Sequence, residues 1–197
     1  MSPNLLLIFV LGPPAAGKGT LCGSLTGQYA VQHMSVGDVL RKVATNNNHP
    51  SINQKLEKQE LINAEELLPI LKDKLSEAGL KDPERRVMLI DGFPRSKAQG
   101  EAFEAQYLAA PQLVQLFRCD KEVARKRYLD RKRGKDDDAM FEKRYHEYEI
   151  ESEAIESAYG KRGLVLEVQV DTEILESWDN LQNLLAQDQR WKSLFVR

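Results

Sequence analysis

The most informative residues of the chain form a short glycine-containing segment, Gly12–Thr20, that includes one lysine. Gly12 and the Gly17–Lys18 pair have the spacing of a loop whose backbone N–H groups and lysine surround the phosphates of a nucleotide. The helix expected to begin here adds partial positive charge at its amino end. Glycine–lysine turns arise often by coincidence, but an apolar strand, this turn and a helix in that order do not. The segment therefore predicts binding of the β- and γ-phosphates of a nucleoside triphosphate.

Two arginines, Arg41 and Arg95, are the next candidates for contact with phosphate. Each follows shortly after an expected strand and the turn that ends it. Arginine stays ionised and offers a planar fork of donors that matches a phosphate group. Phosphoryl transfer is catalysed mainly by positioning and by neutralising the charge on the transferred group. We therefore expect both arginines to hold the phosphate of an acceptor, although Arg41 on its own could be a surface helix residue.

Three further charged residues suit the same chemistry. Asp91 ends an expected strand, where it could hold Mg²⁺ through water or could simply cap the strand. Arg133 and Arg144 flank a short segment that could close over the transferred group and exclude water. Arg144 lies in a highly charged helical stretch, so a solvated surface role is its alternative. With Lys18 and Arg95, these three residues form the predicted catalytic set.

The elements that must position these residues are apolar runs separated by helical patterns. A continuous apolar run is typical of a strand covered on both faces, as in a parallel sheet. Such runs predict strands at residues 5–11, 31–34, 86–91, 113–117 and 164–168. Helices are predicted at residues 17–28, 38–45, 63–79, 96–108, 121–132, 138–159 and 173–186, with another helical segment after residue 50. The alternation predicts an α/β fold, an open five-stranded parallel sheet with helices on both faces and ligands at the carboxyl ends of its strands.

Three ordered motifs make the chain resemble the adenylate kinase and UMP/CMP kinase family. They are Gly17-Lys18-Gly19-Thr20, residues 33–41 (HMSVGDVLR) and residues 91–95 (DGFPR). Residues 142–144 (EKR), which open a helix after an aspartate run, are similar to the segment that follows the family's lid. The resemblance extends over nearly the whole chain. It implies a P-loop NTPase fold in a single domain, 1–197, with an NMP-binding insertion at about 35–66 and a short lid at about 131–141.

The resemblance also implies which residues bind each nucleotide. ATP, with Mg²⁺ as cofactor, is expected at Gly12, Ala15, Ala16, Gly17, Lys18, Gly19, Thr20, Arg133 and Thr172. The acceptor, a nucleoside monophosphate, is expected at Val36, Arg41, Glu60, Leu61, Ile62, Gly92, Phe93, Pro94, Arg95, Gln99 and Arg144. No side chain is expected to bind the metal directly, although Thr20 and Asp91 lie nearby. The implied activity is transfer of the γ-phosphoryl group of ATP to the acceptor.

Gln99 is the residue that bears most on the identity of the acceptor. In the family, a glutamine at this position faces the adenine of AMP, and its amide can pair with both a donor and an acceptor on the base. Asparagine there is associated with pyrimidine acceptors, although some UMP kinases of the family also carry glutamine. Val36 stands where adenylate kinases usually have threonine and UMP/CMP kinases alanine, so it decides nothing. AMP is favoured, and UMP or CMP is the alternative.

Three departures from the family pattern keep another alternative open, a nucleotide-binding protein with reduced or lost turnover. Ala15 replaces a usual glycine and is tolerable only if its φ is negative and its methyl group clears the phosphates. The lid between Arg133 and Asp136 is shorter than in short-lid members and has no evident second arginine, for which Lys135 could substitute only as a point charge. Leu21 replaces a common glutamine. A GTPase is disfavoured, because no Asn-Lys-x-Asp motif occurs.

Composition and charge argue against several other classes. The formal net charge is −2, so we expect no overall attraction to nucleic acid or membrane, and we interpret the basic stretch 118–135 as a lid arm. Cys22 and Cys119 lie far apart, which argues against a disulfide scaffold or a zinc site and indicates a reducing compartment. The apolar run 5–11 is too short to span a bilayer and lacks a basic region before it. We expect a cytoplasmic protein and, from the resemblance, a monomer that binds only nucleotides.

Overall fold

The computed structural model describes residues 5–45, 49–81, 86–107, 109–131 and 137–196. Its centre is a five-stranded, wholly parallel sheet with the strand order β2-β3-β1-β4-β5. The strands are β1 (Leu6–Leu11), β2 (Val31–Ser35), β3 (Val87–Asp91), β4 (Leu113–Arg118) and β5 (Val165–Gln169). The predicted α/β class is confirmed, and each strand end lies within one residue of its predicted position.

The sheet places β1, the strand before the glycine-containing loop, at its centre. It pairs with β3, where Leu6 lies opposite Val87, and on its other side with β4, where Ile8 lies opposite Leu113. Because both faces of β1 are covered, its apolar run does not alternate with polar residues. All carboxyl ends of parallel strands meet at one edge, so the loops after β1, β2 and β3 are neighbours in space.

Helices cover both faces of the sheet. Helices α1, α8 and α9 pack on one face, and α4, α5 and α7 pack on the other. Alternate residues of β1 supply the two cores: Ile8 faces the first group and Phe9 the second. These helices are α1 (Lys18–Gln28), α4 (Ala64–Lys81), α5 (Lys97–Tyr107), α7 (Asp138–Gly160), α8 (Ile174–Gln187) and α9 (Gln189–Ser193).

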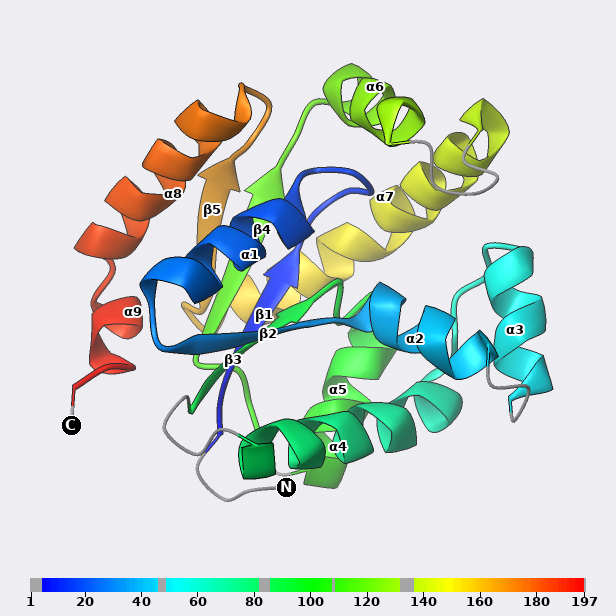
Figure 1. Cartoon of the computed structure of the whole chain (residues 1–197), viewed down its shortest axis with the longest axis horizontal. Coiled ribbons are helices and arrows are strands. Elements are labelled where there is room, and N and C mark those ends of the chain that lie inside the picture. Colours follow the sequence, from blue (N-terminus) through cyan, green and yellow to red (C-terminus); the bar gives the residue numbers. More distant parts are fainter. Residues whose placement is uncertain (1–4, 46–48, 82–85, 108, 132–136, 197) are drawn as a thin grey trace.

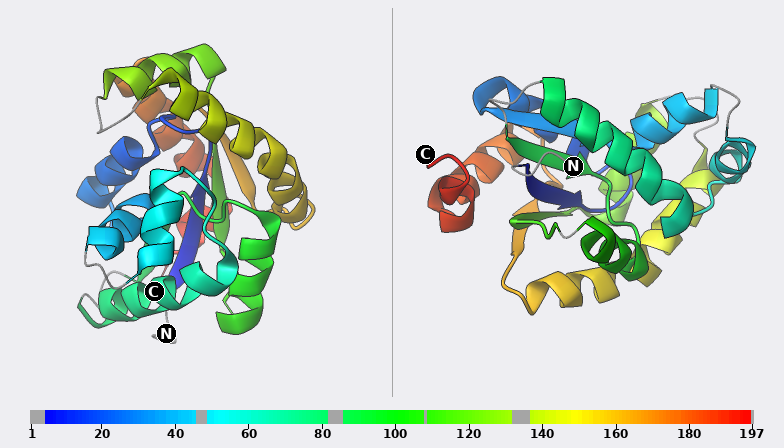
Figure 2. Two further views of the ribbon diagram at one scale, coloured as in Figure 1. Left: turned by 90° about the vertical axis from the view of Figure 1, so that its right-hand side faces the viewer. Right: turned by 90° about the horizontal axis from the view of Figure 1, so that it is seen from below.

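Three more helices stand beside the carboxyl edge of the sheet. Helix α2 (Val36–Thr45) follows β2 directly and α3 (Pro50–Glu57) packs on it, so that both lie to one side of the strands (Figures 1 and 2). Helix α6 (Lys121–Asp130) follows β4, and the side chain of Asp120 caps it by accepting two backbone N–H groups. The described helices agree with the predicted ones to within two residues.

The carboxyl-terminal residues, for which the sequence patterns make no prediction, pack back on the sheet's first helix. Asp188 caps α9, and Trp191 is buried against Tyr29 with the two rings edge to face at 5.1 Å. Across the described ranges, no helix combines the length and the apolar character needed to cross a membrane.

Candidate active site

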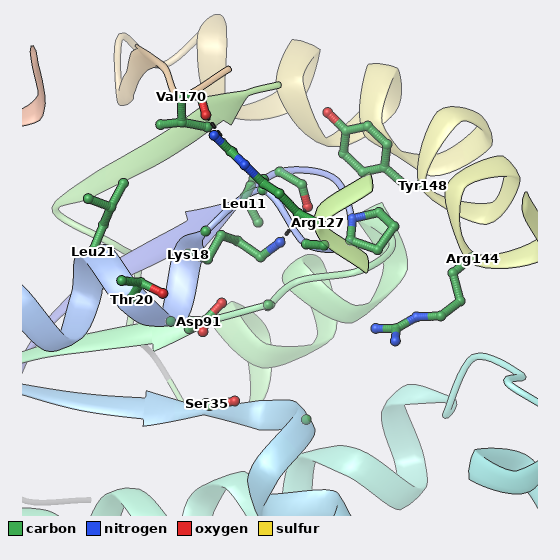
Figure 3. A pocket seen from close by; sticks show the side chains of 18 of the residues that line it. Leu11, Lys18, Thr20, Leu21, Ser35, Asp91, Arg127, Arg144, Tyr148 and Val170 are labelled. Carbon is green, nitrogen blue, oxygen red and sulfur yellow. Dashed lines mark hydrogen bonds between the residues drawn. The ribbon is translucent and has the colours of Figure 1, made fainter. Parts of the chain in front are cut away.

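A cavity of about 1330 Å³ opens at the carboxyl edge of the sheet, where the loops after β1, β2 and β3 meet. Figure 3 shows Lys18 and Thr20 from α1, Asp91 from β3, and Arg144 from α7 arranged around this space. The cavity is therefore built from segments that are far apart in the sequence. It brings together most of the side chains that the sequence predicts to bind nucleotides.

The glycine-containing loop after β1 requires glycine at two positions. Gly12 has φ +140° and Gly17, which precedes α1, has φ +88°, both in the region that other residues avoid. A Cβ atom on Gly12 would also lie 2.6 Å from the carbonyl oxygen of Phe117. Inside the loop, Nζ of Lys18 donates hydrogen bonds to the carbonyl oxygens of Gly12 (2.8 Å) and Pro13 (2.7 Å). The loop thus holds its lysine over its own backbone in the wall of the cavity.

Ala15 does not meet the condition under which the sequence pattern would tolerate alanine at this position. That condition was a negative φ, whereas the φ of Ala15 is +61°. A non-glycine residue in this left-handed region costs roughly 1–2 kcal/mol. The methyl group packs against a small cluster from α6 and α7 that includes Tyr128 and Phe141, and this contact offsets part of the cost. Packing against α6 and α7 therefore supports a conformation that favours glycine.

The ammonium group of Lys18 lies among other charges. Burial lowers the pKa of Lys18 from 10.5 to about 8; Asp91 opposes this shift, whereas Arg95 and Arg144 add to it. Three cations therefore interact across the cavity, with Asp91 as a carboxylate close to them. An anionic ligand would relieve this repulsion, which favours binding of phosphate groups.

Arg41 and Arg95 come together over the backbone of Gly37. A Cβ atom on Gly37 would lie 3.3 Å from Nη1 of Arg41 and 3.7 Å from Nη2 of Arg95, so both guanidinium groups reach the same small space. Arg41 also forms an exposed salt bridge with Asp38. Arg95 is open to the cavity but enclosed by its walls, and this desolvation, together with Arg144, lowers the pKa of Arg95 to about 10. Two guanidinium groups at this distance suit a doubly charged phosphate.

Asp91 faces the space in front of the loop. Its Oδ2 atom would lie 3.5 Å from a Cβ atom on Gly19, and Nε2 of His33 is 3.4 Å from the same oxygen. Among the described residues, no group of three or more His, Cys, Asp or Glu could bind a metal ion by itself. A single carboxylate beside the hydroxyl of Thr20 and the oxygens of a bound nucleotide does suit Mg²⁺, which retains several waters. The residues present therefore fit a Mg²⁺ ion held through water.

Arg144 lines the cavity from α7, and two arginines that the sequence analysis did not predict, Arg127 and Arg131, line it from the end of α6. The guanidinium group of Arg131 lies over the ring of Tyr128, 4.1 Å from its centroid. Arg127 and Arg131 are four residues apart, a spacing that places both on one helix face and could have indicated them. The predicted Arg133 lies outside the described residues.

The loop after β5 also lines the cavity. Thr172, which was predicted to bind ATP, lines the cavity there together with Asp171 and Ile174. Arg127 donates to the carbonyl oxygens of Val170 and Thr172 and so connects this loop to α6.

The predicted acceptor residues divide into two groups. Those that line the cavity are Arg41, Leu61, Gly92, Pro94, Arg95 and Arg144. Val36, Ile62 and Phe93 are instead buried in the apolar core on the α4 and α5 face, and Glu60 is exposed outside the cavity lining. The motif that contains Phe93 and Pro94 thus presents one of these residues to the cavity and the other to the core.

Gln99 also lies behind the cavity rather than in it, because only 2% of its surface is exposed. Its Oε1 accepts the backbone N–H of Arg95 at 2.8 Å, and its Nε2 donates to the carbonyl oxygen of Ile62 at 2.7 Å. Both ends of the amide are therefore occupied by the protein. Gln99 connects the segment that carries Arg95 to the segment before α4.

Comparisons with known proteins agree with this geometry. The family model described as adenylate kinase matches residues 10–176. The adenylate kinase isoenzyme 1 of rabbit (Oryctolagus cuniculus) is 33% identical over 173 residues, covering 84% of this chain and 86% of the relative. The UMP-CMP kinase of zebrafish (Danio rerio) is 30% identical over 197 residues, covering 95% of this chain and all of the relative. UMP-CMP kinase 1 of rice (Oryza sativa subsp. japonica) is 27% identical over 188 residues, covering 93% and 75%.

Proposed function

The chain belongs to the adenylate kinase family, whose members are ATP-dependent nucleoside monophosphate kinases, and from this we propose that it transfers the γ-phosphoryl group of ATP to AMP. The observation that carries the proposal is the presence of several cations in one cavity. Lys18 with its loop, the pair of Arg41 and Arg95 beside Gly37, and Arg144 all line the same space. Such a site suits two phosphate-bearing ligands that meet between these groups.

The donor occupies the side of the cavity formed by the loop after β1. Its β- and γ-phosphates lie against the backbone N–H groups at the start of α1, with Lys18 as the point charge beside them. To bind them, Lys18 exchanges its bonds to the carbonyl oxygens of Gly12 and Pro13 for bonds to phosphate. The nucleoside extends toward Thr172 and Ile174 in the loop that Arg127 fixes.

The acceptor places its phosphate between Arg41 and Arg95, over Gly37. Arg144, and Arg131 from the end of α6, face the group in transfer and neutralise the charge that spreads over its oxygens. No protein group needs to form a covalent bond, because an oxygen of the acceptor phosphate attacks the γ-phosphorus directly while the bond from that phosphorus to the β–γ bridging oxygen breaks and ADP leaves. Residues 35–66 act as the acceptor arm and 131–141 as the lid; of the lid, residues 132–136 lie outside the described part.

Mg²⁺ accompanies ATP, held through water near Asp91 and Thr20. When bound, the ion would supply positive charge that neutralises the phosphates. Asp91 and Thr20 would hold it through water. The balanced net charge and the family resemblance also lead us to propose a cytoplasmic monomer that binds neither nucleic acid nor membrane.

AMP is proposed as the acceptor from the family resemblance at Gln99. UMP or CMP is the second candidate, because both ends of the Gln99 amide are used within the protein and the side chain is buried. In that case the base would contact mainly the segment around Leu61, which lines the cavity. A protein that binds nucleotides with little turnover is the third candidate, supported by the φ of Ala15.

The test is an assay of ADP formation from ATP and Mg²⁺ with AMP, UMP, CMP and dCMP in parallel. Fast turnover with AMP alone supports the proposal, preference for UMP or CMP supports the second candidate, and ATP binding without turnover supports the third.

Arg95→Ala should lower kcat with AMP by at least about 100-fold, because one preorganised charged donor contributes roughly that much to transition-state stabilisation. Its affinity for ATP should change little.

The matched control is Arg86→Ala. Arg86 is exposed and precedes β3, so it lies at the opposite end of that strand from the cavity. This variant removes the same charge from the chain and should keep wild-type turnover. Near-normal turnover by Arg95→Ala would contradict the role assigned to Arg95.

A further inference from the structure

Glu147 is a carboxylate on the wall of the cavity that the proposed transfer does not use. It lies on α7, three residues after Arg144 and four after Lys143, and its side chain is half-buried. It forms no hydrogen bond or ion pair with the residues that the structure describes. A half-buried carboxylate without a direct partner is unfavourable for folding, so its presence beside a phosphate site calls for a reason in function.

The charges around Glu147 are those of the proposed acceptor site. Lys143, Arg95 and Arg144 interact with it electrostatically, and Glu60 repels it. Burial raises the pKa of the Glu147 carboxyl, which is the result expected when a charge loses water without gaining a hydrogen-bond partner. Burial and the positive charge of Arg144 lower the pKa of Arg95, whereas the negative charges of Asp91 and Glu147 raise it.

A contact joins α7, the helix that carries Glu147, to the acceptor arm. Nζ of Lys143 donates to the carbonyl oxygen of Lys58, the residue that follows α3. The turn after α3 is therefore held against α7, and Leu61 at the end of that turn lines the same cavity as Glu147. Glu147 and the turn after α3 therefore line one cavity, the one proposed to hold the acceptor.

We propose that Glu147 is a positioning residue that offsets the repulsion between Arg95 and Arg144 and weakens their hold on the acceptor phosphate, so that the product nucleotide can leave. The inference rests on the proposed function, because it takes the space between these arginines as the acceptor site. Glu147 forms no bond to substrate and exchanges no proton in the transfer. It lowers the net positive charge of the site by one while the arginines keep their positions.

The expected size of the effect follows from Coulomb's law. For charges roughly 7 Å apart at an effective dielectric constant of about 80, removing a unit negative charge favours binding of a phosphate dianion by about sevenfold, and by more where the dielectric constant is lower. The same change slows dissociation of the product. Product release limits turnover in many enzymes, and where it does, slower dissociation lowers kcat while the affinity for the acceptor rises. A loss of structure would instead weaken binding and turnover together.

The experiment compares Glu147→Gln with Glu153→Gln and Glu147→Asp. Glu153 is exposed on the same helix and does not line the cavity, so its variant makes the same change of charge outside the site. Titration calorimetry measures the Kd for AMP, UMP, CMP and ADP without ATP, and initial rates give kcat and the acceptor KM. Each measurement is repeated in 0.5 M NaCl, where screening should reduce the difference.

We expect Glu147→Gln to bind the acceptor at least about sevenfold more tightly than the wild type, with a lower KM and a lower kcat. Glu153→Gln should match the wild type, and Glu147→Asp, which keeps the charge, should lie close to it. Unchanged or weaker binding by a folded Glu147→Gln protein would overturn the inference, even if the wild type is an active kinase. If Glu147→Gln binds the acceptor more tightly than the wild type but neither protein transfers phosphate, the inference is supported and the proposed function is overturned instead.

Discussion

Replacing Gly12 by alanine is expected to destabilise the protein far more than the same change at other glycines of the segment. Gly12 connects β1 to the loop with φ +140°, and a Cβ atom there would lie 2.6 Å from the carbonyl oxygen and 3.0 Å from Cβ of Phe117. The obstructing oxygen belongs to the backbone of β4, so a change of rotamer cannot relieve the contact. The strand or the loop must move instead.

The magnitude can be estimated from two contributions. Holding alanine in a backbone region reserved for glycine costs about 1–3 kcal/mol, and forcing an extra methyl group into filled space costs about 1–3 kcal/mol. Gly12→Ala should therefore lower the free energy of unfolding by about 2–6 kcal/mol, a large part of the total stability of an ordinary domain. ATP binding should fall with it, because the loop and β4 must separate.

Alanine variants at two other glycines distinguish the cost of backbone strain from the cost of steric overlap. Gly17 has φ +88° but no atom within 4 Å of an added Cβ, so its alanine variant suffers backbone strain alone and should lose about 1–2 kcal/mol. Gly23 lies within α1 with open space around it, and its alanine variant should gain about 0.5–1 kcal/mol from helix propensity. Guanidinium unfolding followed by tryptophan fluorescence measures all three, since Trp191 is buried. A loss at Gly12 no larger than that at Gly17 would refute the steric argument.

Two further predictions follow from buried groups. Because burial lowers the pKa of Lys18 to about 8, the lysine is cationic below that pH, so kcat/KM for ATP should fall as the pH rises through about 8; a profile flat to pH 9.5 would contradict this. Over the same window, from about 8 to 10.5, the unfolded chain binds more protons than the folded one, so stability without ligand should rise with pH, as unfolding midpoints would report. Gln115 is fully buried in β4, and neither end of its amide has a hydrogen-bond partner within the described structure. Gln115→Leu should therefore raise the free energy of unfolding by about 1–3 kcal/mol, and a loss of stability would indicate a polar partner such as buried water.

The strands and most helices were predictable from the sequence because burial on both faces leaves a continuous apolar run, as in residues 7–11 of β1. The loop after β1 was predictable for a related reason, since glycine is required where φ is positive and other residues clash. The direction of a side chain within a motif was not predictable in the same way. Phe93 and Pro94 are adjacent in one motif, yet one enters the core and the other lines the cavity.

Tertiary contacts account for the remaining differences. The positive φ of Ala15 depends on packing from α6 and α7, which lie more than a hundred residues later in the chain. Gln99 is turned away from the cavity by hydrogen bonds to Arg95 and Ile62, partners that no local pattern reveals. Arg127 and Arg131 were included in the predicted lid arm but not among the site residues, because their shared helix face does not by itself reveal whether it meets solvent or a cavity.

The strand order has a consequence for how the chain is made. β1 is synthesised before both of its pairing partners, residues 87–91 and 113–118. Until residue 91 has been made, this apolar strand has no native strand to pair with, and its second edge stays open until residue 118 follows. Long-range parallel pairing is also slow to form. Synthesis thus exposes an aggregation-prone segment early, and molecular chaperones that shield residues 5–11 should matter more for the yield of this protein than for its stability once folded.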